Sequence, residues 1–438
     1  MEEQTTIYRL KWLGIAFLVV FPLLFLGGFH VVGPLSARMI VAYGLLAYVL
    51  WRGSTDFVPT RGIQMYYVYI IVYVVISLLN LTAFDTEFIK DLVAIHLVCC
   101  IATFAIPRLF KSDVSIQSAW IVMAFGFILD AVVTMMQYNN SPAGWAIGMY
   151  LNPIDLEGTA EARSYFETAS DFRKSILAGI MGRATANGYF IATMLPVMTY
   201  FIWDRLKLRS LWTYAMFALA GICIYYIQQR MALAVAVAYL FSIILLKKTS
   251  PTTKIFASAA AIIILAFSLD YIHGLDLSRM GRLTSTEDEL RSNTLTVLGD
   301  FLSDPEKVLL GYNQIESAED KTMFLIIGHN AFTGALRLGG IFLLLTFVVL
   351  FYFLCRTLVE IVLFSRREED FRTMGLAVGC LCYLLYSQTH STGVQSGSIM
   401  FWVLYMFTLQ SHRIKYEAIE AEENEGKALE ETTEYQGA

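Results

Sequence analysis

Residues 331–352, AFTGALRLGGIFLLLTFVVLFY, decide the fold class, because this run is apolar enough and long enough to cross a lipid bilayer as a helix. Similar runs of about 18 to 22 residues recur along the chain of 438 residues. The chain is 57% hydrophobic and only 16% charged, which excludes an ordinary soluble domain of this length. Since a membrane β-barrel would show short alternating segments instead, the sequence predicts an all-α polytopic membrane protein.

The apolar runs predict about twelve transmembrane helices. We expect them near residues 12–29, 35–51, 63–81, 91–106, 116–137, 188–203, 210–228, 231–246, 255–269, 331–352, 373–390 and 396–411. Five short connections between them are basic, and they alternate with neutral, acidic or long segments: WRGSTDFVPTRG, RLFKSD, DRLKLR, KKTSPTTK and SRREEDFR. The positive-inside rule places these five connections, and with them both termini, in the cytoplasm.

Residues 1–416 are expected to form one integral membrane domain, and residues 417–438 an acidic, disordered cytoplasmic tail. The tail, EAIEAEENEGKALEETTEYQGA, holds much of the acid behind the net charge of −5. The first apolar run has no small-residue cleavage site after it, so we expect a retained signal anchor.

Two segments predicted on the outer side of the membrane, residues 138–187 and 270–330, are long. In the second, Thr286 and Glu289 have capping-box spacing ahead of an amphipathic run that stops before Pro305. We expect this run to form a helix that lies on the membrane surface or over a cavity.

Basic residues are numerous on the predicted outer side: Arg163, Arg173, Lys174, Arg183, Arg230, Arg279, Arg282 and Arg291. Arg230 falls in a tight turn between two spans, where an Arg is costly unless it snorkels or has an anionic partner. It is either an interfacial Arg that binds helix-end carbonyls or lipid phosphate, or a guanidinium that holds a phosphate in an outward-facing cavity.

His329 and Asn330 close the second outer segment, at the membrane level of Arg230. A lone His at a helix start is more often a cap or an interfacial polar residue than a catalyst. However, imidazole is suited to take a proton from a hydroxyl near neutral pH. An Arg and His cluster at one level therefore suggests acid–base chemistry beside a phosphate leaving group.

Metal-dependent chemistry has little support, because the outer segments contain no Asp-x-Asp pair and no His or Cys set at ligand spacing. The acids at 287–289 fall in the first turn of a predicted helix, where they favour the helix dipole. His273 and His390 also map to the outer side, but no second feature of the sequence supports a functional role for either. Asp130 is either a functional carboxylate or a satisfied interhelical partner, and the sequence does not choose.

Several motifs resemble the O-antigen ligase and O-antigen polymerase family of bacterial surface-glycan enzymes. The stretch HNAFTGALRLGG, with His329, Asn330 and Gly340, is similar to the family signature that opens a transmembrane helix after a long periplasmic segment. IQQRMALAVAVAYL is similar to the family turn that carries an Arg, here Arg230.

Two further stretches extend the resemblance over roughly residues 180 to 400. LRSNTLTVLGDFLSDPEKVLLGYNQ resembles the family's Arg, amphipathic helix and Pro, and so points to Arg291. GIMGRATANGYFIATMLPV resembles a Gly- and Asn-containing entry to a span, and so points to Arg183 and Asn187. The order and common outer location of the motifs are more specific than any one of them.

The resemblance implies a GT-C-like membrane glycosyltransferase in the bacterial inner membrane. Its donor would be a glycan on undecaprenyl diphosphate, presented at the periplasmic face. The acceptor would be a second glycan for a polymerase, or lipid A–core for a ligase. Membrane lipids and, for a polymerase, a chain-length regulator are the other partners it implies, and no nucleic acid is among them.

The residues and the resemblance together predict one mechanism. Arg230 and Arg291, helped by Arg282 or Arg183, clamp the diphosphate and neutralise the charge that develops as the glycosidic bond breaks. His329 orients or deprotonates the acceptor hydroxyl, and the asparagine after it positions that hydroxyl. Direct displacement would invert the anomeric centre, and since the arginines replace a metal, we expect neither metal nor cofactor.

Two other classes of function compete with the transferase. A transporter such as a lipid-linked glycan flippase would usually show internal repeats and charges deep in its spans. A non-catalytic scaffold would leave Arg230 unexplained. Between the two kinds of transferase, Leu343 favours the polymerase, because ligases more often carry a small or polar residue there.

Overall fold

The computed structural model of the protein describes residues 2–32, 35–53, 59–79, 86–152, 177–182, 184–206, 209–227, 230–246, 299, 301–311, 330–389 and 394–436. These residues are almost all helical, and a two-stranded antiparallel hairpin, β1 (His30–Val32) and β2 (Leu35–Ser36), is the sheet they contain. The long helices are α1 (Glu2–Phe25), α2 (Ala37–Arg52), α3 (Arg61–Leu79), α5 (Leu97–Leu109), α6 (Asp113–Tyr138), α10 (Ala184–Arg205), α11 (Arg209–Ile227), α12 (Arg230–Leu246), α18 (Ala331–Arg367), α19 (Phe371–Tyr386) and α20 (Ile399–Gln436). Shorter elements are α4 (Thr86–Asp91), the π-helix η1 (Leu92–His96), α7 (Pro142–Leu151), α16 (Pro305–Leu310) and the 3₁₀ turns η2 (Ser387–Thr389) and η3 (Val394–Ser396).

Five helical stretches in the described part of the chain are long and apolar enough to cross a membrane. They are Thr6–Phe25, Arg61–Leu79, Leu92–Leu109, Asp113–Tyr138 and Ala331–Arg367. Shorter apolar helices cover Leu211–Ile227, Met231–Ile243 and Phe371–Tyr386. The prediction of an all-α membrane protein is therefore confirmed.

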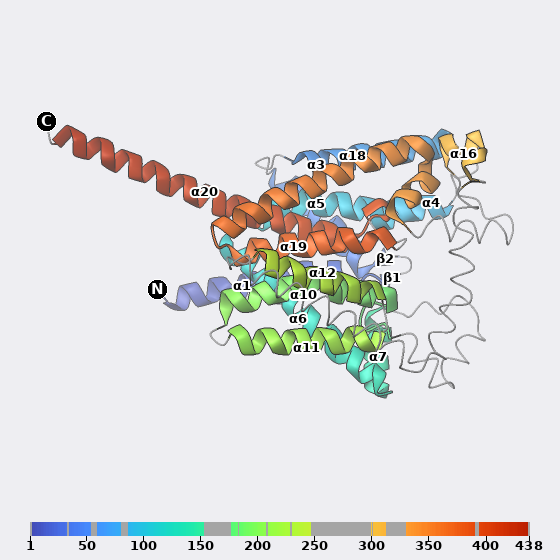
Figure 1. Cartoon of the computed structure of the whole chain (residues 1–438), viewed down its shortest axis with the longest axis horizontal. Coiled ribbons are helices and arrows are strands. Elements are labelled where there is room, and N and C mark those ends of the chain that lie inside the picture. Colours follow the sequence, from blue (N-terminus) through green and yellow to red (C-terminus); the bar gives the residue numbers. More distant parts are fainter. Residues whose placement is uncertain are drawn as a thin grey trace.

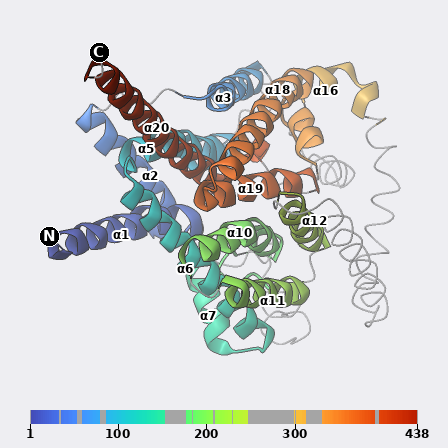
Figure 2. The ribbon, with the colours of Figure 1, turned by 60° about the vertical axis from the view of Figure 1, so that its left-hand side comes forward.

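The long helices lie side by side and run along one axis, and successive helices joined by short connections point in opposite directions (Figure 1). At one end of this bundle α1 begins and α20 continues outward, and we call it the tail end. The hairpin, α7 and α16 lie at the other end, which we call the α16 end (Figure 1). Figure 2 shows the same separation from a second direction.

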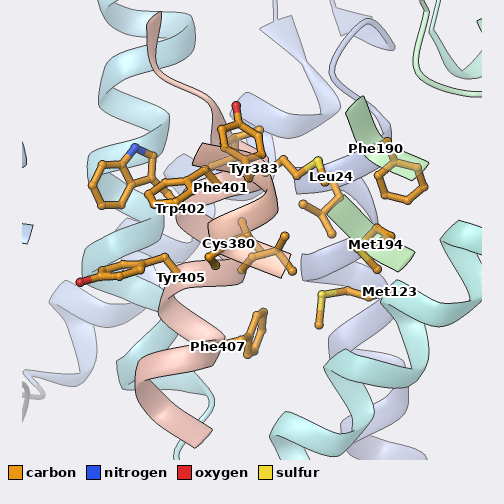
Figure 3. Packing of buried hydrophobic residues seen from close by; sticks show 14 of the residues in the cluster. Leu24, Met123, Phe190, Met194, Cys380, Tyr383, Phe401, Trp402, Tyr405 and Phe407 are labelled. Carbon is orange, nitrogen blue, oxygen red and sulfur yellow. The ribbon is translucent and has the colours of Figure 1, made fainter. Parts of the chain in front are cut away.

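The core centres on α19 and the first part of α20. Residues 401–407 of α20 are all fully buried, and α19 packs against α10, α12, α18 and α20. Figure 3 shows Leu24 of α1, Met123 of α6 and Phe190 of α10 on one side of this core, and aromatic side chains of α19 and α20 on the other. Because aromatic rings and methionines fill this space from several helices, the core fixes how the helix ends are arranged.

The helix α18 is broken near its start, whereas the sequence predicted one continuous span. Gly339 and Gly340 have non-helical backbone angles, and Gly340 has φ 64°. A Cβ at Gly340 would collide with the carbonyl oxygen of Leu309, the penultimate residue of α16. A Cβ at Gly311 would lie 2.5 Å from the carbonyl oxygen of Arg337. The end of α16 thus packs against the break at a distance that only glycine backbone allows.

The predicted disordered tail also differs from the structure, since α20 continues as helix through Gln436 and projects beyond the bundle (Figure 1). Residues 417–436 are rich in Glu and contain several Ala, which favour helix even without tertiary contacts. An ion pair between Arg413 and Glu417, 2.9 Å apart at i,i+4 spacing, lies where the helix leaves the core.

Candidate functional site

The α16 end of the bundle holds the starts of three helices that carry predicted site residues: α10, α12 and α18 (Figure 1). All three helices pack on α19, which ends there. Four predicted site residues, Arg183, Arg282, Arg291 and His329, lie outside the described residues, as do His273 and His390. The described site therefore consists of Asn187, the backbone of Arg230, Asn330 and the groups around them.

Arg230 begins α12, and α11 ends at Ile227. Two residues therefore connect these helices, as the sequence predicted. The turn lies at the α16 end (Figure 1), although the side chain of Arg230 lies outside the described part of the structure. Beside this turn the rings of Tyr138 and Tyr226 stack with centroids 3.6 Å apart, and so join the ends of α6 and α11.

Asn330 is the N-cap of α18 and is tied to the end of α19. Its Oδ1 accepts a hydrogen bond from the N–H of Phe332 at 2.8 Å, and its Nδ2 donates to the carbonyl oxygen of Gln388, also at 2.8 Å. Both bonds fix the backbone at the start of α18, which follows His329 in the chain. The amide keeps a second Nδ2 hydrogen and a second Oδ1 lone pair, so its predicted contact with substrate stays a prediction.

Asn187 was predicted to bind substrate, but the structure places it in the core. Its side chain is fully buried, and its Nδ2 donates to Thr134 Oγ1 and to the carbonyl oxygen of Leu177, both at 2.9 Å. A substrate cannot reach this amide while the helices are packed in this way. The asparagine of this motif therefore joins α10 to α6 and to the segment 177–182.

Asp130, Thr134 and Gln137 form a polar stripe on one face of α6, since their i, i+4 and i+7 spacing returns to the same side of a helix. Asp130 Oδ1 accepts a hydrogen bond from the N–H of Ile180 at 2.8 Å. Gln137 accepts from the N–H of Gly179 at 2.9 Å and donates to its carbonyl oxygen at 3.0 Å. Asp130 is thus buried and binds a segment outside its own helix through one of its two carboxylate oxygens.

Asn152 holds the same segment from the other side. Its Nδ2 donates to the carbonyl oxygens of Phe25 and Ile180, each at 2.6 Å, and its Oδ1 accepts from the N–H of Gly28 at 2.6 Å. One amide thus joins the end of α1, the end of α7 and residues 177–182. Arg183 is the next residue in the chain. The segment that precedes it is therefore bonded both to α6 and to Asn152.

Sequence reasoning missed Arg337, which lies two turns after Asn330 in the short first part of α18. Its Nε and Nη1 atoms are buried, and the hydroxyls of Tyr69 and Tyr73 on α3 are close enough to act on its charge. An Arg within an apolar span is a functional candidate because burying its charge is costly. That signal is present in the sequence, since Arg337 lies within the predicted span 331–352 and not in an outer segment.

His96 was also missed, and it ends the π-helix η1. Its side chain is 4% exposed, and its ring lies 5.3 Å from that of Tyr73. The π-helix brings His96 against Gly397, where a Cβ would lie 3.0 Å from the imidazole Nδ1. Single π-helical turns are frequent at functional sites, but no sequence pattern predicted this one.

Within the described ranges, no three His, Cys, Asp or Glu side chains gather as metal ligands. Metal-independent chemistry stays a prediction, since several candidate residues lie outside those ranges. No protein-family model matches the chain, and no curated protein matches it.

Proposed function

We propose that the protein is a membrane glycosyltransferase that moves a glycan from undecaprenyl diphosphate to an acceptor sugar hydroxyl. One observation carries the proposal most directly. The helix starts that bear the resembling motifs, at α10, α12 and α18, come together around the end of α19 at one end of the bundle. The starts of these three helices lie at one end of the bundle (Figure 1), and this shared location supports a common site for the motifs that they carry.

The contacts at the end of α19 support this convergence. Asn330 joins the start of α18 to Gln388 at 2.8 Å. Tyr189, two residues after Asn187, packs edge-on against Tyr386 of α19, with ring centroids 4.5 Å apart. The helix starts are therefore held by a rigid support, which a site that aligns two large substrates requires.

We further propose a GT-C-like architecture of twelve spans in the bacterial inner membrane. Eleven of the twelve predicted spans fall on described helices, and the span at 255–269 lies outside them. Basic residues cluster at the tail end, where the described parts of four of the five basic connections lie: Arg52, Arg61, Arg108, Lys111, Arg205, Arg366 and Arg367 (Figure 1). By the positive-inside rule the tail end, with both termini, is cytoplasmic and the α16 end is periplasmic.

In the proposed reaction the acceptor hydroxyl oxygen attacks the anomeric carbon of the donor glycan. The bond from that carbon to the diphosphate oxygen breaks, and undecaprenyl diphosphate leaves with the electron pair. His329 takes the hydroxyl proton, while Arg230 and Arg291 stabilise the negative charge on the leaving group. Attack opposite the leaving group inverts the anomeric centre.

The supporting arginines have different standing in this scheme. Arg183 directly follows a segment that Asp130, Gln137 and Asn152 bind, and we assign it a supporting contact with the diphosphate. The role proposed for Arg282 is supported only by its location in the predicted outer segment. Asn330 acts through the backbone next to His329, and it takes a positioning role in the proposal.

The proposal favours a repeat-unit polymerase, and a gel of surface glycan from the host that lacks this gene tests it. A single repeat unit on lipid A–core, with no ladder, supports the polymerase. Bare core, with long undecaprenyl-linked glycan accumulating, identifies a ligase instead. An unchanged ladder contradicts both the polymerase and the ligase for this surface glycan. It would favour a transporter of lipid-linked glycan, or a transferase that acts on a different glycan.

A further inference from the structure

The polar stripe of α6 contains two oxygen atoms whose hydrogen bonding is incomplete. Asp130 and Asn187 are both fully buried. Within the described structure, Asp130 Oδ2 and Asn187 Oδ1 have no hydrogen-bond partner. Both are acceptors, so neither can satisfy the other unless one of them carries a hydrogen.

We propose that Asp130 carries a proton in the folded protein and that this neutral acid donates a hydrogen bond inside the cluster around Gly179, with Asn187 Oδ1 as its acceptor. The two side chains meet at Gly179, since a Cβ there would contact both Asp130 Oδ1 and Asn187 Nδ2. No ion pair to Asp130 occurs within the described part of the chain, and a buried ionised carboxylate without a counter-charge would be very costly, whereas a neutral acid needs only hydrogen-bond partners. One proton, taken from water, turns Asp130 Oδ2 into a donor and supplies a hydrogen to the cluster. Asp130 Oδ1 keeps its bond from the N–H of Ile180, 2.8 Å away.

The surroundings favour a proton over a metal cation. Donor groups already point into this cluster, namely the N–H of Ile180 and the Nδ2 of Asn187, and their positive ends would repel a cation. The cluster is also closely packed around Gly179, where a Cβ would lie 2.8 Å from Asn187 Nδ2 and 2.8 Å from Thr134 Oγ1 and would collide with Asp130 Oδ1. A proton needs no added volume, whereas a cation needs several oxygens at metal distance.

The neutral acid has a positioning role that rests on the proposed function. Asp130 and Gln137 together bind three backbone groups of Gly179 and Ile180, and Gly179 has φ 54°, which favours glycine. These bonds fix the segment that continues into Arg183, the proposed ligand of the diphosphate. Loss of the acid would loosen this segment, and Arg183 with it, while the rest of the bundle keeps its packing.

Infrared spectroscopy of the purified full chain in lipid nanodiscs tests the proton directly. The wild-type protein at neutral pH should show the carbonyl stretch of a protonated carboxylic acid, and the Asp130→Asn protein should lack it. Asp113→Asn is the matched control, because Asp113 is 54% exposed at the tail end and should leave the band in place. Absence of the band from the wild-type protein would overturn the proposal.

Two variants of Asp130 test the positioning role without any need for activity. Asn has the shape of the neutral acid, with an oxygen for Ile180 and an N–H for Asn187, whereas Leu has neither. Hydrogen exchange at Gly179 and Ile180 should stay slow in Asp130→Asn and rise at least tenfold in Asp130→Leu. Fast exchange in Asp130→Asn would mean that the folded protein needs a carboxylate, which contradicts the proposal.

Transfer kinetics then connect the stripe to Arg183. In Asp130→Leu, the KM for lipid-linked donor should rise roughly tenfold with a smaller change in kcat, and Asp130→Asn should restore the wild-type KM. An unchanged KM in Asp130→Leu would refute the positioning role. If the wild-type protein transfers no glycan, the proposed function fails, but the infrared and exchange results still decide the state of Asp130.

Discussion

At the scale of single residues, the described part of the candidate site consists of polar groups that bind other parts of the chain. Asn187 and Asn330 both belong to resembling motifs, and both use their amides to bind other parts of the chain. The charged residues assigned to chemistry instead follow or precede such anchors in sequence. This arrangement explains why a polar residue in a motif need not touch substrate.

The first prediction concerns the reacting groups. His329→Ala and Arg291→Ala should each lower transfer by roughly 10² to 10⁴-fold, because they remove the proposed base and a charge-stabilising cation. The measurement is product formed by purified protein at matched amounts. Arg367→Ala is the control, since Arg367 is exposed at the tail end and should behave as wild type. Full activity in either site variant would remove that residue from the mechanism.

The second prediction concerns the cap of α18. Asn330→Ala should destabilise the protein by roughly 1–2 kcal/mol, because it removes the N-cap and the bond to Gln388. Asn330→Asp keeps a capping oxygen but loses the donor. Its unfolding midpoint should therefore lie between those of the wild-type protein and of Asn330→Ala. Thermal unfolding measures both.

A matched control for the cap is Asn139→Ala. Asn139 is exposed and donates only to the carbonyl oxygen of Met135 in its own helix, at 2.9 Å. Its loss should change stability by less than about 0.5 kcal/mol. An equal effect at the two positions would show that the link between α18 and α19 contributes little.

At the scale of elements, the broken α18 is the feature on which the α16 end depends. At the break the backbone of α16 approaches Gly340, and the backbone of α18 approaches Gly311, more closely than any side chain would permit. The first part of α18 is thereby an independent short helix, held by its N-cap, by α3 and by α16.

The third prediction is that Gly340→Ala disrupts this junction. The substituted residue would need a positive φ and would collide with the carbonyl oxygen of Leu309, so stability should fall by about 1–3 kcal/mol and activity should drop. Gly44→Ala is the control, since a Cβ there meets nothing within 4 Å in α2. That variant should be neutral or more stable by about 0.5–1 kcal/mol. Matching behaviour of the two variants would contradict the close approach.

The elements differ in how far the sequence predicts them. Apolar runs predict where helices such as α3, α6 and α19 lie, because crossing a bilayer demands length and composition that are local properties. The break in α18 depends on α16, about thirty residues earlier in the chain. The partner of Asp130, Ile180, is 50 residues away in the chain, so in the sequence the stripe on α6 looks like isolated polar residues. The helix of residues 417–436 was missed because acidity was weighed above helix propensity.

At the scale of the whole molecule, the fourth prediction is the orientation in the membrane. In intact cells, a membrane-impermeant maleimide should label Asn139→Cys, at the α16 end, and should not label Glu369→Cys, at the tail end. Both positions are exposed, so access across the membrane decides the result. The unchanged chain, whose six cysteines are buried or half-buried, gives the background. The reverse pattern would place the site in the cytoplasm.

The fifth prediction is that a chelator leaves glycan transfer unchanged, because in the proposed mechanism guanidinium groups supply the positive charge at the diphosphate. Purified protein is assayed with and without the chelator, and added Mg²⁺ should bring no gain. A loss that added metal restores would assign the charge stabilisation to a cation instead.

The projecting helix of α20 has a practical consequence for imaging. From residue 412 to Gln436 it extends roughly 35–40 Å as one helix that continues from the fully buried part of α20. A small folded protein fused in helical register at its end would share the orientation of the bundle. For a particle with little mass outside its detergent micelle, such a rigid marker would guide alignment in electron cryo-microscopy.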